Sequence, residues 1–371
     1  MLKQASRHLR NRAKALGWRI GSLCGVVEGS RAPVSFVVER ADWSIRWDGE
    51  HIRDVVNELT GQTTVEVSDA AHRVTGPQVV HFGSQYMWLD WGRLLSGRNR
   101  YAVTFFHGKP EDGPEVERHI EQFLKSVPAL DKVVTAASLI EQRLLGWGVP
   151  RDKLVRIPIG VDTRAFRRPT EQERQQARQR FAFQSRQVVI GSFQKDGVGW
   201  GDGMEPKLIK GPDLFVAAVA RMARDLPVAV LLTGPARGYV MRELERRQIP
   251  FVHTYVKDQV DIADCYHALD LYLVTSREEG GPKGIMEGMA SGVPLVSTRV
   301  GMASDLIEDG ITGGLVLGGT ATEIAAKAMQ ILSHDDPEGL RARARKAVLA
   351  TDWSEVGKDH WYKVYQPALR S

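Results

Sequence analysis

The sequence predicts an α/β protein built from two doubly wound domains. The chain has 371 residues, which is longer than one small hydrophobic core usually spans. In both halves, short apolar runs alternate with longer amphipathic segments, which is the pattern of parallel βα units. A polar, charge-rich segment, 163–186, separates the two halves and is expected to bridge them. Hydrophobic residues make up 43% and charged residues 26% of the chain, as in soluble globular proteins.

Each half contains five expected strands. In the first half the strands cover 34–39, 64–67, 78–82, 101–106 and 132–135, and the helices cover 50–59, 114–126 and 138–146. In the second half the strands cover 188–192, 228–232, 251–255, 271–275 and 295–298, and the helices cover 211–224, 239–247, 260–268, 282–291 and 321–333. A last helix is expected over 353–369. Domains of this kind bind ligands outside the carboxyl ends of their strands.

One segment, Glu279-Gly-Gly-Pro-Lys-Gly-Ile-Met-Glu287, combines two carboxylates with a turn and the start of a helix. Pro282 suits the first turn of a helix, where its missing N–H costs nothing. The amides of Lys283 and Gly284 would then face outward at the helix N-terminus, which attracts phosphate. Carboxylates accept hydrogen bonds from sugar hydroxyls. The segment therefore predicts a binding site for a nucleotide sugar, although a solvated pair of acids is the alternative.

This segment, continued through Met289-Ala-Ser-Gly-Val-Pro294, resembles the large family of retaining glycosyltransferases with the GT-B fold, whose signature is two Glu separated by seven residues. The resemblance implies two Rossmann-like domains facing across a crevice, with a C-terminal helix that crosses back to the first. It implies that Glu287 holds the ribose and Glu279 faces the donor sugar, with Gly281 in the turn between them. The implied parts are a basic segment over 1–27, an acceptor domain over 28–165, a nucleotide-sugar domain over 187–350 and a closing helix over 351–371.

The same resemblance assigns cationic residues to the diphosphate. Lys210-Gly-Pro-Asp matches the Lys-Gly that precedes the first helix of the second domain, so Lys210 is expected to stabilise the leaving phosphate. The family usually pairs this Lys with an Arg after the preceding strand, but the chain has Ser192 there. Lys195 or Lys207 could take its place as a point charge. Between them, four glycines over 197–203 predict a mobile flap or a backbone approach to the ligand, unless the loop is an inert insertion.

Two histidines follow expected strands of the first half. His107, in Val103-Thr-Phe-Phe-His-Gly, matches the family's His near the anomeric carbon of the donor, where it would position and polarise the reacting centre. A chance loop histidine is the alternative. His81 ends the preceding strand and is a second candidate, for the acceptor side.

Base and acceptor recognition are less clearly marked. Backbone at Tyr255 and Val256, after the third strand of the second domain, would contact the base. Trp43 and Trp47 follow the first strand, in the place of a glycine-rich loop of the family, and their indole rings could stack on the acceptor sugar. Core packing explains such a pair equally well. Near the end of the first domain, the usual Asn of the family is replaced by Ile159.

The first 27 residues contain six basic and no acidic side chains. Leu2, Ala5, Leu9, Ala13, Leu16 and Ile20 recur at steps of three and four, which predicts an amphipathic helix. Such a helix could lie on an anionic membrane surface through residues 1–20. Packing of the same stripe on its own domain is the alternative.

The sequence favours a retaining glycosyltransferase that moves a sugar from a nucleoside diphosphate to a saccharide or lipid-linked saccharide. With no Asp-x-Asp pair and no metal-ligand spacing, no cofactor and no metal are expected. The two cysteines and the lack of a long apolar run favour a cytoplasmic protein, peripheral to the inner face of a membrane. The alternatives are a phosphorylase or epimerase of the same fold and a non-catalytic sugar-binding protein or partner subunit. Nucleic-acid binding is not expected, because the basic residues cluster at the terminus.

Overall fold

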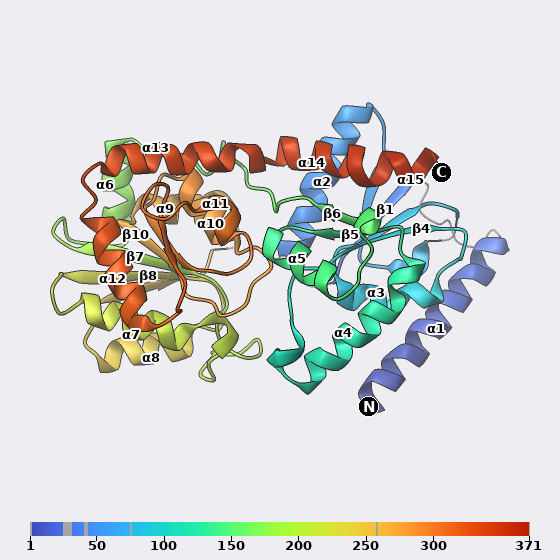
Figure 1. Ribbon diagram of the computed structural model, residues 1–371, viewed down its shortest axis with the longest axis horizontal. Helices are drawn as coiled ribbons and strands as arrows, with labels where there is room; N and C mark the ends of the chain where they lie inside the picture. Colours follow the sequence, from blue (N-terminus) through green and yellow to red (C-terminus); the bar gives the residue numbers. More distant parts are fainter. Residues whose placement is uncertain (1, 25–31, 41–43, 75, 257–258, 371) are drawn as a thin grey trace. The chain divides into compact units, whose positions relative to one another are not determined.

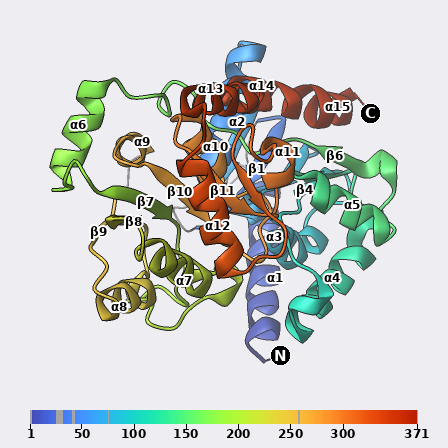
Figure 2. The same cartoon turned by 60° about the vertical axis from the view of Figure 1, so that its left-hand side comes forward.

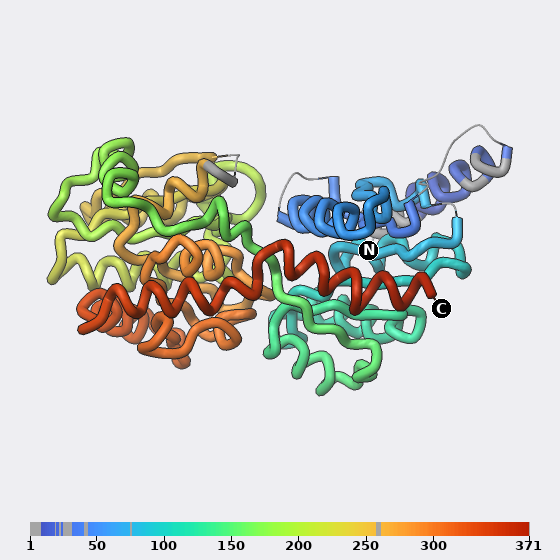
Figure 3. Tube along the Cα trace, turned by 90° about the horizontal axis from the view of Figure 1, so that it is seen from above, coloured from blue at the N-terminus to red at the C-terminus, as the bar shows by residue number. Residues whose placement is uncertain are grey.

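The computed structural model describes residues 2–24, 32–40, 44–74, 76–256 and 259–370. The chain forms two compact units, which are described separately below (Figure 1). The first unit consists of the residues up to Ile159 together with those from Trp353 onward, and the second runs from Gly160 to Asp352. The chain therefore returns to its first unit at the end, as the tube in Figure 3 shows from α13 onward.

The first unit is built on six parallel strands in the order β2-β1-β3-β4-β5-β6. They are β1 (Val34–Val37), β2 (Val65–Ser68), β3 (Val79–Phe82), β4 (Arg100–Thr104), β5 (Lys132–Thr135) and β6 (Leu154–Arg156). The helices are α1 (Leu2–Leu23), α2 (Ser44–Thr60), α3 (Gln85–Trp91), α4 (Pro114–Ser126), α5 (Ser138–Gly146), α14 (Trp353–His360), a π-helical turn (Trp361–Tyr365) and α15 (Gln366–Arg370). Helix α14 packs beside α2, and α3 lies against α1 and α4 (Figure 1).

The second unit has a parallel sheet in the order β12-β11-β10-β7-β8-β9. Its strands are β7 (Val188–Phe193), β8 (Val228–Thr233), β9 (Phe251–Thr254), β10 (Leu271–Val274), β11 (Leu295–Thr298) and β12 (Gly314–Val316). Its helices are α6 (Glu171–Arg180), α7 (Pro212–Met222), α8 (Gly238–Arg246), α9 (Gln259–His267), α10 (Lys283–Ala290), α11 (Ala303–Leu306), α12 (Ala321–Leu332) and α13 (Pro337–Val348). Helix α7 packs against α8 and α12, whereas α10 packs against α9 and α13 (Figure 2).

The predicted α/β class with two parallel sheets is confirmed, and all ten expected strands are present. The sheets bury continuous apolar runs such as β8, whose six residues are all buried, because helices cover both faces. Strands β6 and β12 were not predicted; both have three residues and lie at a sheet edge, where a hydrophobic run is too short to stand out. The order of strands reverses between β1 and β3 in one sheet and between β7 and β10 in the other.

Two expectations about local structure need correction. The segment from Ser44 to Gly49 was expected to be a loop, but it is the first part of α2. The segment 163–186 was expected to bridge the domains, but it lies in the second unit and contains α6. Helix α6 is attached to that unit by Arg174 and Arg178, which both form ion pairs with Asp270. Its polar sequence therefore reflects ionic anchoring to one unit.

His81 lies in the core of the first unit, where it connects β3 to the C-terminal segment. Its side chain is fully buried, with Nδ1 2.9 Å from the hydroxyl of Tyr365 and Nε2 2.9 Å from that of Thr104. The ring also stacks near that of His360, which is equally enclosed. Both ring nitrogens of His81 have partners inside the protein, so its assignment to acceptor binding is corrected: it is a core residue.

The buried histidines make the stability of the first unit sensitive to acid. Burial lowers the pKa of His360 from 6.5 to about 4, and burial together with the charge of His360 lowers that of His81. Above the unfolded pKa of 6.5 both states are neutral and no stability is lost. As the pH falls from 6.5 to about 4, the unfolded chain takes up protons that the folded chain refuses, so the unfolding free energy decreases.

For His360 alone we expect a loss of about 2–3 kcal/mol across this range. The measurement is denaturant unfolding of the whole chain between pH 7 and pH 4, in the wild type and in His360→Gln. The variant should be less stable at pH 7 but show a shallower decrease with acid. A variant of the exposed His253, His253→Gln, is the control and should keep the wild-type slope. An unchanged slope in His360→Gln would contradict the prediction.

Candidate functional site

The loops after β7 and β10 meet at the carboxyl edge of the second sheet, where its strand order reverses. In open α/β sheets, this reversal leaves a crevice that ligands commonly occupy. The loop after β7 leads to Lys210, and the loop after β10 leads to Glu279 and α10. The structure thus brings together the main residues that the sequence assigned to the donor.

Lys210 and Glu279 form the centre of this site. The Nζ atom of Lys210 lies 2.5 Å from Oε1 of Glu279, and the same oxygen accepts a hydrogen bond from Ser276 Oγ at 3.0 Å. The Glu279 and Lys210 side chains are only 10% and 21% exposed. A partly desolvated ion pair of this kind holds an ammonium group where an anion can approach it. Ser276, which the sequence analysis missed, could have been found from its position directly after a predicted strand.

Gly211 allows the two loops to approach each other. Its φ is +65°, and a Cβ atom at this position would lie 1.8 Å from the carbonyl oxygen of Thr275. Thr275 in turn donates from Oγ1 to the carbonyl of Gly211 at 2.9 Å. A side chain at residue 211 would therefore separate Lys210 from the loop that carries Glu279.

Helix α10 presents its N-terminus at the same edge of the sheet. The helix begins at Lys283, one residue later than expected, so Pro282 is the N-cap residue and not the first helical residue. Pro282 has no side chain that can cap the helix by a hydrogen bond. Gly284 packs against Tyr272: a Cβ atom there would lie 2.4 Å from its hydroxyl oxygen. The amides and the helix dipole form a suitable seat for phosphate oxygens.

Glu287 is oriented by an aromatic cluster beneath α10. Its Oε2 atom accepts a hydrogen bond from the hydroxyl of Tyr266 at 2.9 Å. Tyr266 is fully buried and packs against Tyr272 and Phe193. Burial, with a smaller contribution from the charge of Glu287, raises the pKa of Tyr266 well above its usual value, so it remains a hydrogen-bond donor. Tyr266 is a second residue that the sequence analysis missed, since a tyrosine within α9 gave no signal of its own.

Two further lysines lie near Lys210. Partial desolvation, followed by the charge of Lys210, lowers the pKa of Lys207, and Lys195 acts in the same direction. The ammonium group of Lys195 lies 3.7 Å from the ring centroid of Trp200. The mutual influence of these charges shows that the three lysines that the sequence assigned to the donor share one region.

The glycine-rich loop is pinned to α8 and is not a free flap. Lys207 N donates to the carbonyl of Asp196 at 2.7 Å, and the loop carbonyls of Asp202 and Gly203 accept from the first amides of α8 at 2.7 and 2.9 Å. A Cβ atom on Gly203 would lie 2.1 Å from the carbonyl of Ala236. The expectation of a mobile flap is therefore wrong for the base of the loop. Trp200, at its tip, is 65% exposed.

The side chain of Arg237 is buried beneath Ser192. Ser192 stands at the position where the family usually has an Arg. Arg237 Nη1 donates to the carbonyls of Ser192 and Thr233 at 2.6 and 2.8 Å, and its Nε lies 3.0 Å from Oδ1 of Asp196. The side chains of Arg237 and Asp196 are 0% and 1% exposed. This buried ion pair, which the sequence analysis did not anticipate, joins β7, β8 and the base of the glycine-rich loop.

Tyr255 and Val256 follow β9 at the edge of the sheet. Tyr255 is 58% exposed. Two residues earlier, within β9, His253 contacts the carbonyl of Gly234 through Nε2 at 2.8 Å. The structure places these residues at the same carboxyl edge as Lys210, and their contact with a base stays a prediction.

In the first unit, His107 follows β4 and is half-buried. Its carbonyl accepts a hydrogen bond from Gln85 Nε2 at 3.2 Å, and the next carbonyl, that of Gly108, accepts from Arg143 at 3.1 Å. Gln85 is 1% exposed and lies on α3. Two buried or half-buried side chains thus fix the backbone that carries His107, and Gln85 is a positioning residue that sequence reasoning missed.

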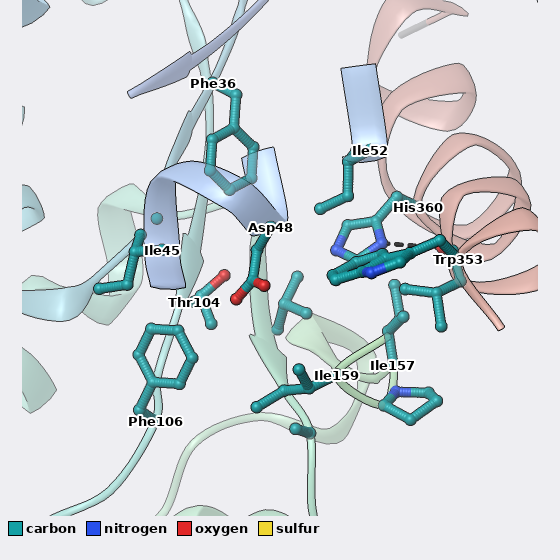
Figure 4. Close-up of a pocket in the computed structure, with 15 residues that line it drawn as sticks. Phe36, Ile45, Asp48, Ile52, Thr104, Phe106, Ile157, Ile159, Trp353 and His360 are labelled. Atoms are coloured by element: carbon teal, nitrogen blue, oxygen red, sulfur yellow. Dashed lines mark hydrogen bonds between the residues drawn. The ribbon is translucent and has the colours of Figure 1, made fainter. Parts of the chain in front are cut away.

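A pocket lies at the carboxyl edge of the first sheet, where its strand order reverses (Figure 4). Its lining comes from the sheet edge, α2 and α14: Phe36, Ile45, Asp48, Ile52, Gly83, Thr104, Phe106, Val134, Ala136, Ile157, Pro158, Ile159, Trp353, Val356 and His360. Figure 4 shows the carboxylate of Asp48 directed into this mostly apolar space. Asp48 was not singled out in the sequence because its position on a helix was not recognised.

Of the two tryptophans expected near the acceptor, Trp43 lies outside the described residues. Trp47 is half-buried on α2, one residue before Asp48, and does not line the pocket. Ile159, which replaces the family's Asn, does line it.

Among the described residues, no group of three or more His, Cys, Asp or Glu side chains is arranged to hold a metal ion. Within the same residues, no helix is both long and apolar enough to cross a membrane.

Comparisons with known proteins agree with this geometry. Residues 202–334, which include Lys210 and α10, match the family described as glycosyl transferases group 1. The chain is 27% identical to the D-inositol 3-phosphate glycosyltransferase of Geodermatophilus obscurus, over 78% of this chain and 66% of that protein. It is 28% identical to the N-acetyl-alpha-D-glucosaminyl L-malate synthase of Bacillus anthracis, over 42% of each. The chain thus spans between two fifths and two thirds of the length of these two relatives.

Solved structures share the fold. HepE of Anabaena in complex with UDP and glucose superimposes with a TM-score of 0.73 at 16% identity, over 90% of this chain and 99% of that one. The sucrose-phosphate synthase of Thermosynechococcus elongatus gives a TM-score of 0.72 at 16% identity, over 92% and 100%.

The two parallel sheets, together with these likenesses, define the GT-B fold. Over residues 202–334, which hold the Glu279–Glu287 segment, the chain is similar to the group 1 glycosyltransferases.

Proposed function

We propose that the protein transfers a sugar from a nucleoside diphosphate to a saccharide or lipid-linked saccharide acceptor, with retention of the anomeric configuration. The observation that carries this proposal is the position of Lys210, Glu279 and the N-terminus of α10 at one edge of the second sheet. HepE, which shares the fold, is described in complex with UDP and glucose. UDP-glucose is therefore the first donor to test.

In the proposed reaction, the bond between the anomeric carbon and the diphosphate breaks, and its electron pair leaves with the phosphate oxygen. Lys210 and the amides of Lys283 and Gly284 stabilise the growing negative charge. The acceptor hydroxyl then bonds to the anomeric carbon from the same face, and its proton passes to the departing diphosphate oxygen. Glu279 would face the donor sugar, and His107 would act near the anomeric carbon.

The proposal includes catalysis without a metal ion or another cofactor. Lysine and helix amides supply positive charge to the diphosphate in place of a cation. The charges of Lys195 and Lys210 both lower the pKa of Lys207, so the three lysines are near enough to act on one diphosphate, which supports this view. Activity that persists in excess chelator would be the expected result, and loss of activity that is restored by a divalent cation would refute it.

The direct test measures release of nucleoside diphosphate and the anomeric configuration of the product. We expect diphosphate release with UDP-glucose or another nucleotide sugar, and an α-linked product from an α-linked donor. A non-catalytic sugar-binding protein would bind the nucleotide without release in the presence of any acceptor. A phosphorylase would need inorganic phosphate, and an epimerase would change the donor without releasing the diphosphate.

Glu287→Gln is expected to raise the KM for the nucleotide sugar about tenfold, because it weakens a charge-assisted hydrogen bond to the ribose. The turnover number should change little, since the ribose is bound equally in the ground and transition states. Steady-state kinetics with varied donor measures both. Glu245→Gln, on the exposed face of α8, is the matched control. An equal loss in kcat with an unchanged KM would contradict the assigned role.

We further propose that the acceptor binds at the carboxyl edge of the first sheet, with Asp48 accepting a hydrogen bond from one of its hydroxyls. The carboxylate directed into the pocket of Figure 4 supports this assignment, with a cavity volume of about 40 Å³ that admits one hydroxyl group of the acceptor and not a whole sugar ring. Asp48→Asn should raise the KM for the acceptor about tenfold and leave donor hydrolysis in water unchanged. An equal effect on hydrolysis and transfer would show that Asp48 does not act on the acceptor.

Helix α1 supports the proposal of a membrane surface as partner. It packs on the first unit through Asn11 and Ala15, which are 9% and 5% exposed, and through Trp18, whose ring contacts that of His72. Leu9, Leu16 and Ile20, from the stripe predicted in the sequence, are 54–67% exposed. Leu9, Leu16 and Ile20 are thus not used for packing on their own unit, and exposed Arg10, Arg12 and Lys14 lie among them.

An exposed apolar stripe on a basic helix fits an anionic lipid surface. The test is sedimentation of the whole chain with vesicles that contain an anionic phospholipid. Changing Leu9, Leu16 and Ile20 to serine should reduce binding, whereas Leu59→Ser, at another exposed leucine of the same unit, should not. Equal sedimentation of both variants would dismiss a membrane role for the helix.

A further inference from the structure

A second pocket lies on the opposite side of the second unit from Lys210. It lies at the start of β10 and β11, where α9 and α10 end, and it has a cavity volume of about 290 Å³. Four segments line it: the residues before and within the first turns of α6, the turn after α9, the turn after α10, and the first turn of α13. This volume is at the lower end of the range of small-molecule sites.

Two arginines at the rim share a single carboxylate. Arg341 Nη1 lies 2.6 Å from Oε1 of Glu338, and Arg168 Nη2 contacts the other oxygen of the same group. Each guanidinium has five N–H donors. The shared carboxylate engages only one or two of these donors on each arginine, and Glu171 is a second carboxylate in the lining of the pocket.

The carbonyl groups at the ends of α9 and α10 would normally repel an anion, but arginine side chains already bind them. Arg174 Nη1 donates to the carbonyl of Leu269 at 2.7 Å and to that of His267 at 3.4 Å. Arg345 Nη1 donates to the carbonyl of Ala290. The negative ends of both helices are thus neutralised by residues of the unit itself.

Two buried polar atoms of the lining have no hydrogen-bond partner within the described part of the chain. They are Oγ of Ser291 and Nε2 of His267, in residues that are 1% and 6% exposed. Burial of a polar group without a partner is costly, and native proteins rarely retain one without a reason. Burial lowers the pKa of His267, while Asp264, the carbonyl of Arg167 and Glu173 act in the opposite direction.

Gly292 gives Arg168 its place at the pocket. Its φ is +67°, and a Cβ atom there would lie 2.5 Å from Cγ of Arg168. The aliphatic part of Arg168 therefore lies directly on the backbone of the turn between α10 and β11. This contact keeps the guanidinium at the rim, beside Glu338.

We propose that this pocket binds a small phosphorylated molecule with free hydroxyl groups, such as a sugar phosphate. Arg168 and Arg341 bind the phosphate group, for which planar guanidinium groups are well suited. Ser291 and His267 exchange hydrogen bonds with the hydroxyls of the ligand. The pocket is distinct from the donor site and does not depend on the proposed transfer reaction.

Tyr266 also lines this pocket, and its hydroxyl donates to Glu287 at the donor site. Because a change at Tyr266 would affect both places, the test uses other residues. The variants Arg341→Gln and Ser291→Ala address the pocket, and Lys210→Ala addresses the donor site. Arg343→Gln is the matched control, because Arg343 lies on α13 near Arg341 but pairs with Asp336 and does not line the pocket.

The experiment is isothermal titration of the whole chain with glucose 6-phosphate, inorganic phosphate and glucose. We expect glucose 6-phosphate to bind more tightly than phosphate, and glucose not to bind. Arg341→Gln and Ser291→Ala should each weaken glucose 6-phosphate binding, by about tenfold for the arginine and about threefold for the serine. Arg343→Gln and Lys210→Ala should bind like the wild type.

Two outcomes would overturn the proposal. One is that neither phosphate compound binds the wild-type chain at millimolar concentration. The other is that binding is lost in Lys210→Ala but retained in Arg341→Gln and Ser291→Ala, which would place the phosphate in the donor site. Failure of diphosphate release, in contrast, would refute the transfer reaction and leave this pocket unaffected.

Discussion

Replacing Lys210 with alanine is expected to lower the rate of sugar transfer about 100- to 1,000-fold, which is the usual effect of removing one group that stabilises a developing oxyanion. The ammonium group of Lys210 is largely buried beside Glu279 and lies at the edge of the sheet where the α10 amides also face outward. In a partly desolvated site its charge acts more strongly on a leaving phosphate than it would in water.

The kinetic signature should separate Lys210 from its neighbours. We expect most of the loss in kcat, because charge on the phosphate grows in the transition state. Lys207→Ala should cost less, since partial burial and the charge of Lys210 lower the pKa of Lys207 and so already disfavour its charged form. Lys327→Ala, which removes an ion pair with Asp309 far along the chain, is the control for loss of a lysine in the same unit.

Steady-state kinetics of donor hydrolysis and transfer, with circular dichroism to check folding, measures the effect. A folded Lys210→Ala protein with wild-type turnover would show that the diphosphate does not depend on Lys210. The assignment of the donor site would then be wrong.

Arg237→Met is expected to lower the unfolding free energy by about 3–5 kcal/mol, which is the cost of leaving one charge of a buried ion pair without its partner. The change removes the ion pair with Asp196 and the bonds to Ser192 and Thr233. Burial, opposed by the charge of Arg237, already raises the pKa of Asp196. Without Arg237, the carboxylate would be buried with no compensating charge.

A double variant tests this explanation. Arg237→Met combined with Asp196→Leu should be less destabilised than Arg237→Met alone, because a buried apolar pair avoids the desolvation of charges. Arg343→Met breaks an exposed pair with Asp336 and should cost less than about 1 kcal/mol. Denaturant unfolding measures all three. A double variant that is less stable than the single one would contradict the account of the buried charge.

The alternation of apolar and amphipathic runs was sufficient to predict ten strands and both sheets. Helices with a distinct apolar face, such as α4 and α5, were predicted with the bounds that the structure has. The pattern did not reveal α3, α13 or the first turns of α2. The sequence of α13 alternates arginine and alanine, and one of its three buried residues is the small Ala344, so its apolar stripe is weak.

For the donor site, local motifs identified the residues proposed to bind the ligand but not those that hold them in place. Lys210, Glu279, Glu287 and α10 carry recognisable spacing. Tyr266 and Arg237 act through contacts with residues 21 and 45 positions away in the chain. Such partners are set by the packing of strands and helices, and no single-sequence pattern encodes them.

The sequence by itself determined the fold class and the order of the βα units, and it supplied the motif of two glutamates on which the proposed donor site rests. These depend on short-range spacing, which a 3.6- or 2-residue period or a turn expresses directly. Only the tertiary structure decided that Lys210 pairs with Glu279, that His81 is a core residue, and that Leu9, Leu16 and Ile20 of α1 are exposed. The physical reason is that burial and ion pairing depend on which strands become neighbours. In both sheets this order reverses along the chain, so distant segments meet.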